Sequence, residues 1–179
     1  MMEKFSDELK AKAAKIKWFF TDVDGTLTDG CVYYSPGGEA LKKFSLRDGA
    51  GHFLLHQSGI KTGIISGENS PIVERRANKL KVDALLMNAV PKVDTIKSFL
   101  KDNNVSFEEV AYIGDDYNDI KLFNVCGLSF AVGDANQLAK DAADYVCKAN
   151  GGNGAYREAA EILLALRDIN IERIITNQL

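Results

Sequence analysis

The stretch FFTDVDGT, residues 19–26, joins an apolar run to two carboxylates, Asp22 and Asp24. The run predicts a strand over residues 17–23, and acids that follow such a strand point into the crevice beyond its carboxyl end, where open α/β sheets bind ligands. Hydrated Mg²⁺ prefers oxygen ligands of this kind together with phosphate oxygens. The spacing also allows Asp22 to attack phosphorus while Asp24 transfers a proton. Taken alone, the pattern is equally compatible with an ordinary Asp-Gly turn. Two turn residues are expected to offer free backbone N–H groups to the phosphate: Gly25 and Thr26.

A second apolar run that ends in acids is VAYIGDDYND, residues 110–119. Asp115 and Asp116 are adjacent and would repel each other without a cation between them. Asp119 follows about one helical turn later. The alternative is a helix whose first-turn acids complement its dipole.

Two further residues suit a bound phosphate group. Ser66 ends the apolar run at residues 63–66 and is followed by Gly67, so its hydroxyl could bind a phosphate oxygen at a strand tip; the alternative is a helix N-cap. Lys92 begins an amphipathic helix predicted over residues 92–103. Because the helix dipole opposes a cation there, the position favours a specific anionic partner over a solvated lysine.

Strands and helices alternate along the remaining chain, which predicts an α/β, Rossmann-like three-layer sandwich with a mainly parallel sheet. A β-hairpin is expected at about residues 31–45, around a glycine turn at 35–39. The spacing between motifs leaves no room for a lid, so we expect one capless domain over residues 1–179 with a glycine-rich tail at about 148–179. Strands are expected at 62–65, 84–87, 110–113, 128–132 and 145–147, and helices before residue 17 and near 48–57, 70–80, 92–103, 118–124, 136–142 and 154–167.

Composition narrows the class of protein. With 179 residues, 46% of them hydrophobic, the chain can bury one good core. The net charge is −3 and no basic stripe is present, which argues against a nucleic-acid partner. The three cysteines have no metal-binding spacing, and the N-terminus lacks an apolar segment, so we expect a reducing, cytoplasmic location without a membrane anchor.

In order and spacing, these residues resemble the four motifs of the haloacid dehalogenase superfamily of phosphohydrolases. The segments LRDG (46–49) and GGNGAYRE (151–158) are similar to those of a subgroup that acts on 3-deoxy-D-manno-octulosonate 8-phosphate and nine-carbon relatives. The resemblance implies Mg²⁺-dependent hydrolysis of the eight-carbon phosphate through an aspartyl-phosphate. The alternative substrate is a nonulosonate 9-phosphate or N-acylneuraminate 9-phosphate. The resemblance implies that Asp22 is the nucleophile and Asp24 the general acid and base, with Mg²⁺ held by Asp22, Asp115 and the backbone carbonyl of Asp24. It also implies that Asp116 and Asp119 orient the metal's waters and Lys92. The residues implied to surround the phosphate are Gly25, Ser66, Gly67 and Lys92.

Five charged residues are candidates for substrate contacts: Arg47, Glu68, Arg76, Lys79 and Arg157. Arg76 and Lys79 are three apart and share a helix face, which is also typical of a solvated surface. In the subgroup, charge at the position of Glu68 distinguishes eight-carbon from nine-carbon substrates. Asp48, beside Arg47, is expected to be a helix N-cap.

The missing lid raises the question of what closes the site. The resemblance implies a homotetramer in which the hairpin and tail of one chain cover the neighbour's site. On that hypothesis, truncation after Cys147 should leave the catalytic acids and most of the sheet in place. Two rival functions are a non-catalytic assembly module and a receiver-type signalling domain, which also places acids and a lysine around Mg²⁺.

Overall fold

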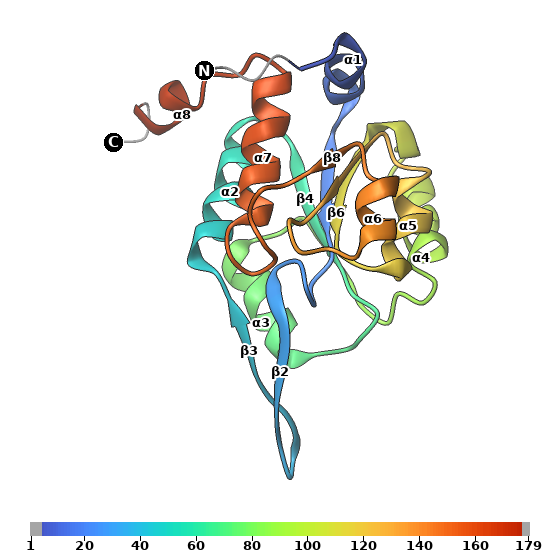
Figure 1. Cartoon of the computed structure of the whole chain (residues 1–179), viewed down its shortest axis with the longest axis vertical. Helices are drawn as coiled ribbons and strands as arrows, with labels where there is room; N and C mark the ends of the chain where they lie inside the picture. The colour runs from blue at the N-terminus through green and yellow to red at the C-terminus, as the bar shows by residue number, and fades with distance from the viewer. Residues whose placement is uncertain (1–4, 177–179) are drawn as a thin grey trace.

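The structure, a computed structural model, describes residues 5–176. Six parallel strands form one sheet in the order β5-β4-β1-β6-β7-β8 (Figure 1). The strands are β1 Trp18–Thr21, β4 Lys61–Ile65, β5 Ala84–Leu86, β6 Val110–Gly114, β7 Leu128–Ala131 and β8 Tyr145–Val146. The expected parallel sheet is confirmed, because every pairing within it is parallel.

Helices cover both faces of this sheet. In Figure 1, α2 and α7 lie on one side of it and α4, α5 and α6 on the other, so the three-layer arrangement is confirmed. The helices are α1 Asp7–Lys15, α2 Leu46–Gln57, α3 Pro71–Leu80, α4 Lys92–Asp102, α5 Tyr117–Phe123, α6 Gln137–Ala142, α7 Ala155–Leu166 and α8 Ile171–Thr176. Neither α8 nor the 3₁₀ turn η1 Phe107–Glu109 was predicted from the sequence. No helix among residues 5–176 is long and apolar enough to cross a bilayer.

The central strand β1 is buried along its whole length. Phe19 packs against Phe130 of β7, two strands away, with ring centroids 5.5 Å apart, and against Tyr156 of α7 at 5.2 Å, while Phe20 packs against Phe99 of α4 at 5.5 Å. Such a two-sided burial explains why the strand reads as a continuous apolar run. It also fixes the point at which Asp22 leaves the sheet.

The hairpin is a separate two-stranded antiparallel sheet, formed by β2 Thr28–Ser35 and β3 Gly38–Phe44. It starts three residues earlier than expected and projects well beyond the rest of the molecule in Figure 1. Its turn needs Gly38, whose φ of 106° is costly for other residues. Between β1 and β4 the chain forms only this hairpin and α2, as expected for a capless fold.

The C-terminal segment corrects one expectation. Residues 155–166 form α7, which buries Tyr156, Leu163 and Leu164 completely and packs along α2. Removing so much buried apolar surface would expose the core, since each large side chain contributes about 1.5–3 kcal/mol. The expected tolerance of truncation after Cys147 is therefore wrong: the segment is part of the core and not a peripheral tail.

Candidate active site

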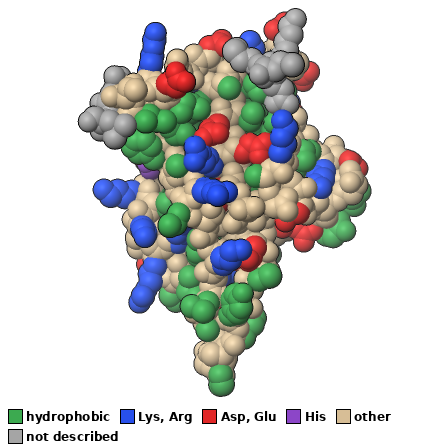
Figure 2. All heavy atoms as spheres, turned by 60° about the vertical axis from the view of Figure 1, so that its left-hand side comes forward, with side chains coloured by type: hydrophobic (Ala, Val, Ile, Leu, Met, Phe, Trp, Pro, Cys, Tyr) green, Lys and Arg blue, Asp and Glu red, His purple; other side chains and the backbone are tan. Residues whose placement is uncertain are grey.

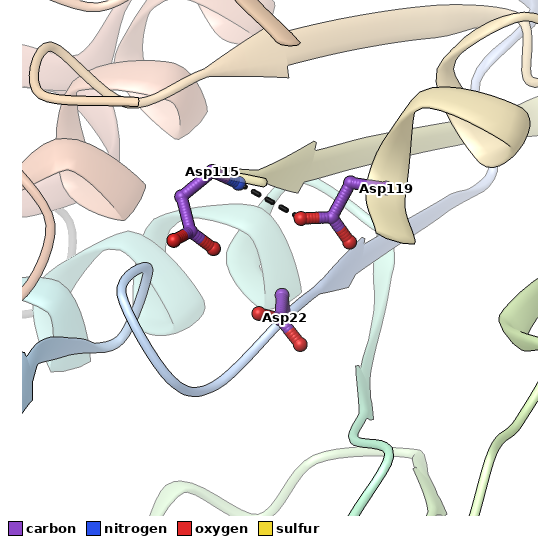
Figure 3. Close-up of side chains that lie close together, drawn as sticks. All are labelled: Asp22, Asp115 and Asp119. Carbon is purple, nitrogen blue, oxygen red and sulfur yellow. Dashed lines mark hydrogen bonds between the residues drawn. The ribbon is translucent and has the colours of Figure 1, made fainter. Parts of the chain in front are cut away.

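The carboxyl ends of β1 and β6 bring three aspartates together. These two strands are neighbours at the point where the strand order reverses, which is where open α/β sheets bind ligands. Asp22 follows β1, while Asp115 and Asp119 follow β6. Carboxylate oxygens of all three lie within 4.8 Å of one another, and Figure 3 shows the side chains converging.

Lys92 joins this cluster from the first turn of α4. Its side chain is buried, and Nζ lies 2.7 Å from Asp22 Oδ1 and 2.6 Å from Asp119 Oδ1. Burial alone would lower the pKa of Lys92, but the two carboxylates outweigh it and raise the pKa. Lys92 is therefore a buried, charged lysine with specific anionic partners, and not a solvated one.

Asp119 uses both of its oxygens within the protein. Oδ1 accepts from Lys92 and from the Tyr112 hydroxyl at 2.5 Å, and Oδ2 accepts from the backbone N–H groups of Asp115 and Asp116 at 2.9 and 3.1 Å. Because a carboxylate has about four acceptor sites, none is left for a metal. Asp119 therefore orients Lys92 and the loop after β6. Tyr112 was not among the residues predicted from the sequence, although a tyrosine inside an aliphatic strand signals a buried hydroxyl that needs a partner.

Asp22 and Asp115 have the donor chemistry that a divalent cation requires. Burial, with the nearby Asp22 and Asp119 charges, raises the pKa of Asp115 to about 8. Burial also raises the pKa of Asp22 to about 6, despite the opposing effect of Lys92. A divalent cation between these hard oxygens would offset both penalties.

Gly25 allows Asp115 to reach this position. A Cβ at Gly25 would lie 2.0 Å from Asp115 Oδ2, and its φ is +86°, so both space and backbone conformation require glycine. The Thr26 hydroxyl donates to Asp115 Oδ1 at 3.3 Å. However, the N–H of Gly25 donates to Thr28 Oγ1 and that of Thr26 to the Val23 carbonyl. The expectation that these two N–H groups are free is wrong.

Two other residues predicted for the site, Ser66 and Asp116, differ in burial and in their partners. Ser66 is buried at the end of β4, and its Oγ accepts from the Glu68 N–H at 3.2 Å; the N-cap of α3 is Ser70, so the N-cap alternative for Ser66 is wrong. Asp116 is exposed and is not part of the cluster: it caps α5 and accepts from Asn136 Nδ2 at 2.5 Å. Its position gives no support for the expected role behind the metal.

Asp24 has a partner that the sequence analysis missed. Lys42 of β3 places Nζ 2.5 Å from Asp24 Oδ1, and the Lys42 side chain is fully buried. Strand alternation offered a signal, because one of two consecutive lysines, Lys42 and Lys43, must face the body of the protein. The hairpin thus reaches back to the loop after β1.

Comparison with known proteins agrees with this geometry. Residues 75–158 match the family model of haloacid dehalogenase-like hydrolases. The 3-deoxy-D-manno-octulosonate 8-phosphate phosphatase KdsC of Haemophilus influenzae is 40% identical over 156 residues, which cover 87% of each chain. The chain belongs to the KdsC family of haloacid dehalogenase-like phosphatases.

Solved structures of the KdsC family share the whole fold. The enzyme of Moraxella catarrhalis, solved in complex with a magnesium ion, a phosphate ion and KDO, has a TM-score of 0.91 at 34% identity and covers 98% of this chain and 100% of its own. The cobalt-bound Haemophilus influenzae enzyme has a TM-score of 0.84 at 40% identity, covering 88% and 92%. The superfamily and subgroup predicted from the motifs are confirmed.

The substrate candidates of this KdsC-family chain do not form one cluster. Glu68 lines a cavity of about 520 Å³ between the hairpin and α3, together with Tyr34 and Arg75, which the sequence analysis did not single out. Arg76 instead packs over the Phe44 ring and donates to the Ser45 carbonyl at 2.8 Å, so it joins α3 to the end of the hairpin.

The remaining three candidates lie at different places on the surface. Lys79 is exposed roughly 12 Å along α3 from its first residue, at 1.5 Å per residue. Arg47 is exposed in the first turn of α2. Arg157 is partly exposed and pairs with Glu161 at 2.7 Å. Within residues 5–176, none of the three forms a hydrogen bond or an ion pair with the aspartate cluster.

Two further residues act within the chain. Ser45 is the N-cap of α2, so the expected N-cap role of Asp48 is wrong; buried Asp48 instead accepts from the Arg157 N–H at 3.1 Å, at the start of α7. Gly151 passes so close to the loop after β1 that a Cβ would lie 1.8 Å from the Gly25 carbonyl oxygen. The glycine-rich segment therefore supports the loop of its own chain.

Proposed function

We propose that the protein is a Mg²⁺-dependent phosphatase that hydrolyses 3-deoxy-D-manno-octulosonate 8-phosphate. One observation carries the proposal: a buried Asp22–Lys92–Asp119 chain with Asp115 beside it, at the ligand-binding edge of a fold shared with KdsC enzymes. A lysine held between two carboxylates has little use in an assembly module. Asp24 is included as the general acid and base.

Asp22, Asp115 and the backbone carbonyl of Asp24 would hold Mg²⁺, which supplies charge neutralisation for the phosphoryl oxygens. Asp119 is excluded as a direct ligand because the protein already occupies its oxygens. Ser66 would bind a phosphoryl oxygen, with Gly25 and Gly67 beside it. Lys92, whose three N–H donors already contact Asp22, Tyr112 and Asp119, would stabilise the phosphoryl oxygens through its charge. Asp116 would contribute only indirectly, by capping the N-terminus of α5.

Catalysis would proceed in two displacements. Lys92 holds Oδ1 of Asp22, which leaves the other carboxylate oxygen to attack phosphorus in line. The bond from phosphorus to the sugar oxygen breaks, and Asp24 protonates the departing oxygen. Asp24 then removes a proton from water, which attacks the aspartyl-phosphate and releases inorganic phosphate and free Asp22.

Closure of the site would come from neighbouring copies in a homotetramer. Three large apolar side chains of the hairpin are 57–73% exposed: Tyr33, Tyr34 and Leu41. Figure 2 shows hydrophobic side chains gathered on this projecting end of the molecule. Exposed apolar surface of this kind favours contact with another protein surface. The described cysteines are all unpaired, which supports the proposed cytoplasmic location.

A phosphate-release screen tests the proposal. We expect the eight-carbon keto-deoxy sugar phosphate to give the highest kcat/KM, followed by nine-carbon keto-deoxy sugar phosphates, with simple hexose phosphates far below. Asp22→Asn is the matched inactive control. A higher kcat/KM for a nine-carbon substrate would replace the proposed substrate, and no release from any phosphate ester would favour the assembly module.

A further inference from the structure

Lys42 is the most enclosed charged group of the hairpin. None of its side chain is exposed, and Nζ contacts Asp24 Oδ1 at 2.5 Å and Glu39 Oε2 at 3.1 Å. Glu68 lies further away, at 4.0 Å, and is largely exposed. An ammonium group carries three N–H donors, so two short contacts to carboxylates commit most of its capacity.

A second contact anchors this pair to the body of the protein. The hydroxyl of Ser70 donates to Glu39 Oε1, and Ser70 is buried. Ser70 occupies the N-cap position of α3 but makes no side-chain capping bond, although serine caps usually do. Its hydroxyl is used for the hairpin instead. A continuous chain of contacts therefore runs from α3 through Glu39 and Lys42 to Asp24.

The neighbouring lysine provides a contrast. Lys43 faces away from the body, with 64% of its side chain exposed, and pairs with Asp29 of the hairpin at 2.9 Å. Exposed pairs of this kind contribute little to stability. Lys42 has no access to solvent, so it would meet a substrate only after leaving both carboxylates. Its geometry therefore suits the holding of Asp24 better than direct substrate binding.

The position of Asp24 shows what is being held. Its carboxylate is outside the cluster of Asp22, Asp115 and Asp119 and is about one-third exposed, whereas Asp22 is almost fully buried. If the Asp24 side chain rotated freely, it would populate rotamers in which its carboxyl group cannot reach the departing oxygen. Contact with an immobile ammonium group restricts those rotamers.

We propose that Lys42 is a positioning residue for the proton transfer: braced by Glu39 and Ser70, it holds the Asp24 carboxylate in place for the leaving oxygen. This inference rests on the proposed phosphatase function. It couples the acid–base step to the placement of the hairpin. Any movement of the hairpin relative to α3 would then change catalysis and not only substrate access.

The test compares Lys42→Met with Lys43→Met as the matched control. On the sugar phosphate, which has a poor leaving group, Lys42→Met should lower kcat on the order of 30-fold, which is part of the roughly 10²–10⁴-fold that general acid–base catalysis contributes. On p-nitrophenyl phosphate, which leaves without protonation, the loss should stay below about threefold. KM should change little for either substrate. Lys42→Arg, which keeps the charge, should restore part of the lost kcat, and Lys43→Met should match the wild type.

Ser70→Ala is the second variant, because it leaves the ion pair intact and removes only its anchor. It should lower kcat on the sugar phosphate in the same direction but less, and it decides the question if Lys42→Met does not fold. Equal losses on both substrates, or a change confined to KM, would overturn the positioning role while leaving the phosphatase function in place. A wild-type protein that releases no phosphate from any ester would overturn both.

Discussion

The sheet-edge site and the hairpin differ in how far their own chain completes them. At the sheet edge, Lys92 is 4% exposed and Asp119 is fully buried, and every oxygen of Asp119 has a partner. On the hairpin, Tyr34 is 73% exposed and Leu41 64%. The groups proposed for phosphoryl transfer are thus held in place within one chain, whereas the apolar surface of the hairpin has no partner among the described residues.

On the proposed function, the buried residues at the sheet edge carry out the chemistry, and the exposed hairpin takes part in closing the site over the substrate. Buried, fully hydrogen-bonded groups need no reorganisation during the reaction, which is how fixed charges contribute most to catalysis. By contrast, an isolated two-stranded hairpin is only marginally stable in water. Variants at the sheet edge should therefore affect every phosphate ester, and variants on the hairpin should discriminate between substrates.

Asp22→Asn should have the largest effect. The amide cannot attack phosphorus, so kcat should fall on the order of 10⁴-fold or more for sugar and aryl phosphates alike. Circular dichroism should show an unchanged fold. Asp94→Asn, an exposed acid on α4, is the control and should remain fully active. Residual activity close to wild type with an intact fold would exclude Asp22 as the nucleophile.

Removal of Mg²⁺ by a chelator should abolish turnover of both substrate types. Ca²⁺ should not restore it, because its larger and looser coordination shell misplaces the reacting groups. Phosphate release with each ion measures this directly. Full activity in excess chelator would contradict the proposed metal dependence.

The same metal site predicts a pH-dependent stability. The pKa values of Asp22 and Asp115 rise from 3.8 to about 6 and about 8, so between pH 4 and 8 the folded protein binds more protons than the unfolded chain. Metal-free stability should therefore fall as pH rises through this window. Mg²⁺ binds the deprotonated acids, so it should raise Tm by several °C more at pH 8.5 than at pH 5.5. Thermal melts at both pH values test this, and equal shifts would contradict it.

Lys92→Met should reduce both activity and stability. The change leaves Asp22 and Asp119 buried without their cation, and breaking a buried ion pair in this way costs about 3–5 kcal/mol. For a chain of this size that corresponds to a fall in Tm of roughly 10 °C. Lys97→Met, an exposed lysine on the same helix, should change Tm by less than about 2 °C. An unchanged Tm for Lys92→Met would mean that the buried contacts are not formed.

Tyr34→Ser should have the smallest effect on the chemistry and the clearest effect on assembly. If neighbouring hairpins close the site, the native mass should drop below that of the wild type, and kcat/KM for the sugar phosphate should fall about tenfold more than for an aryl phosphate. Leu138→Ser, an exposed apolar residue on α6, is the control. A wild-type monomer by light scattering that is fully active on its sugar phosphate would remove the reason for intersubunit closure.

Local patterns explain why much of the fold was predictable. The four central strands of the parallel sheet, β4, β1, β6 and β7, are buried on both faces, so each appears as an apolar run that ends in a polar or glycine residue, as at Ile65–Ser66 and Ile113–Gly114. The placement of Asp22 and Asp115 near each other followed from the rule that parallel strands end at one edge. Substrate contacts were harder to predict: Arg76 and Lys79 share a helix face, yet Arg76 is used to hold the hairpin.

Periodicity and spacing along the chain were enough to predict the strands, most of the helices, the family and the charged groups at the ends of β1 and β6, but not η1 or α8. Which of these groups meet in space followed only from the folded structure. The contacts of Lys42 with Asp24, of Lys92 with Asp22 and of Gly151 with Gly25 join segments that are separate in sequence. The same packing made α7 part of the core rather than a removable tail. Which residues contact each other depends on distances in the folded structure, and local sequence patterns carry no information about those distances.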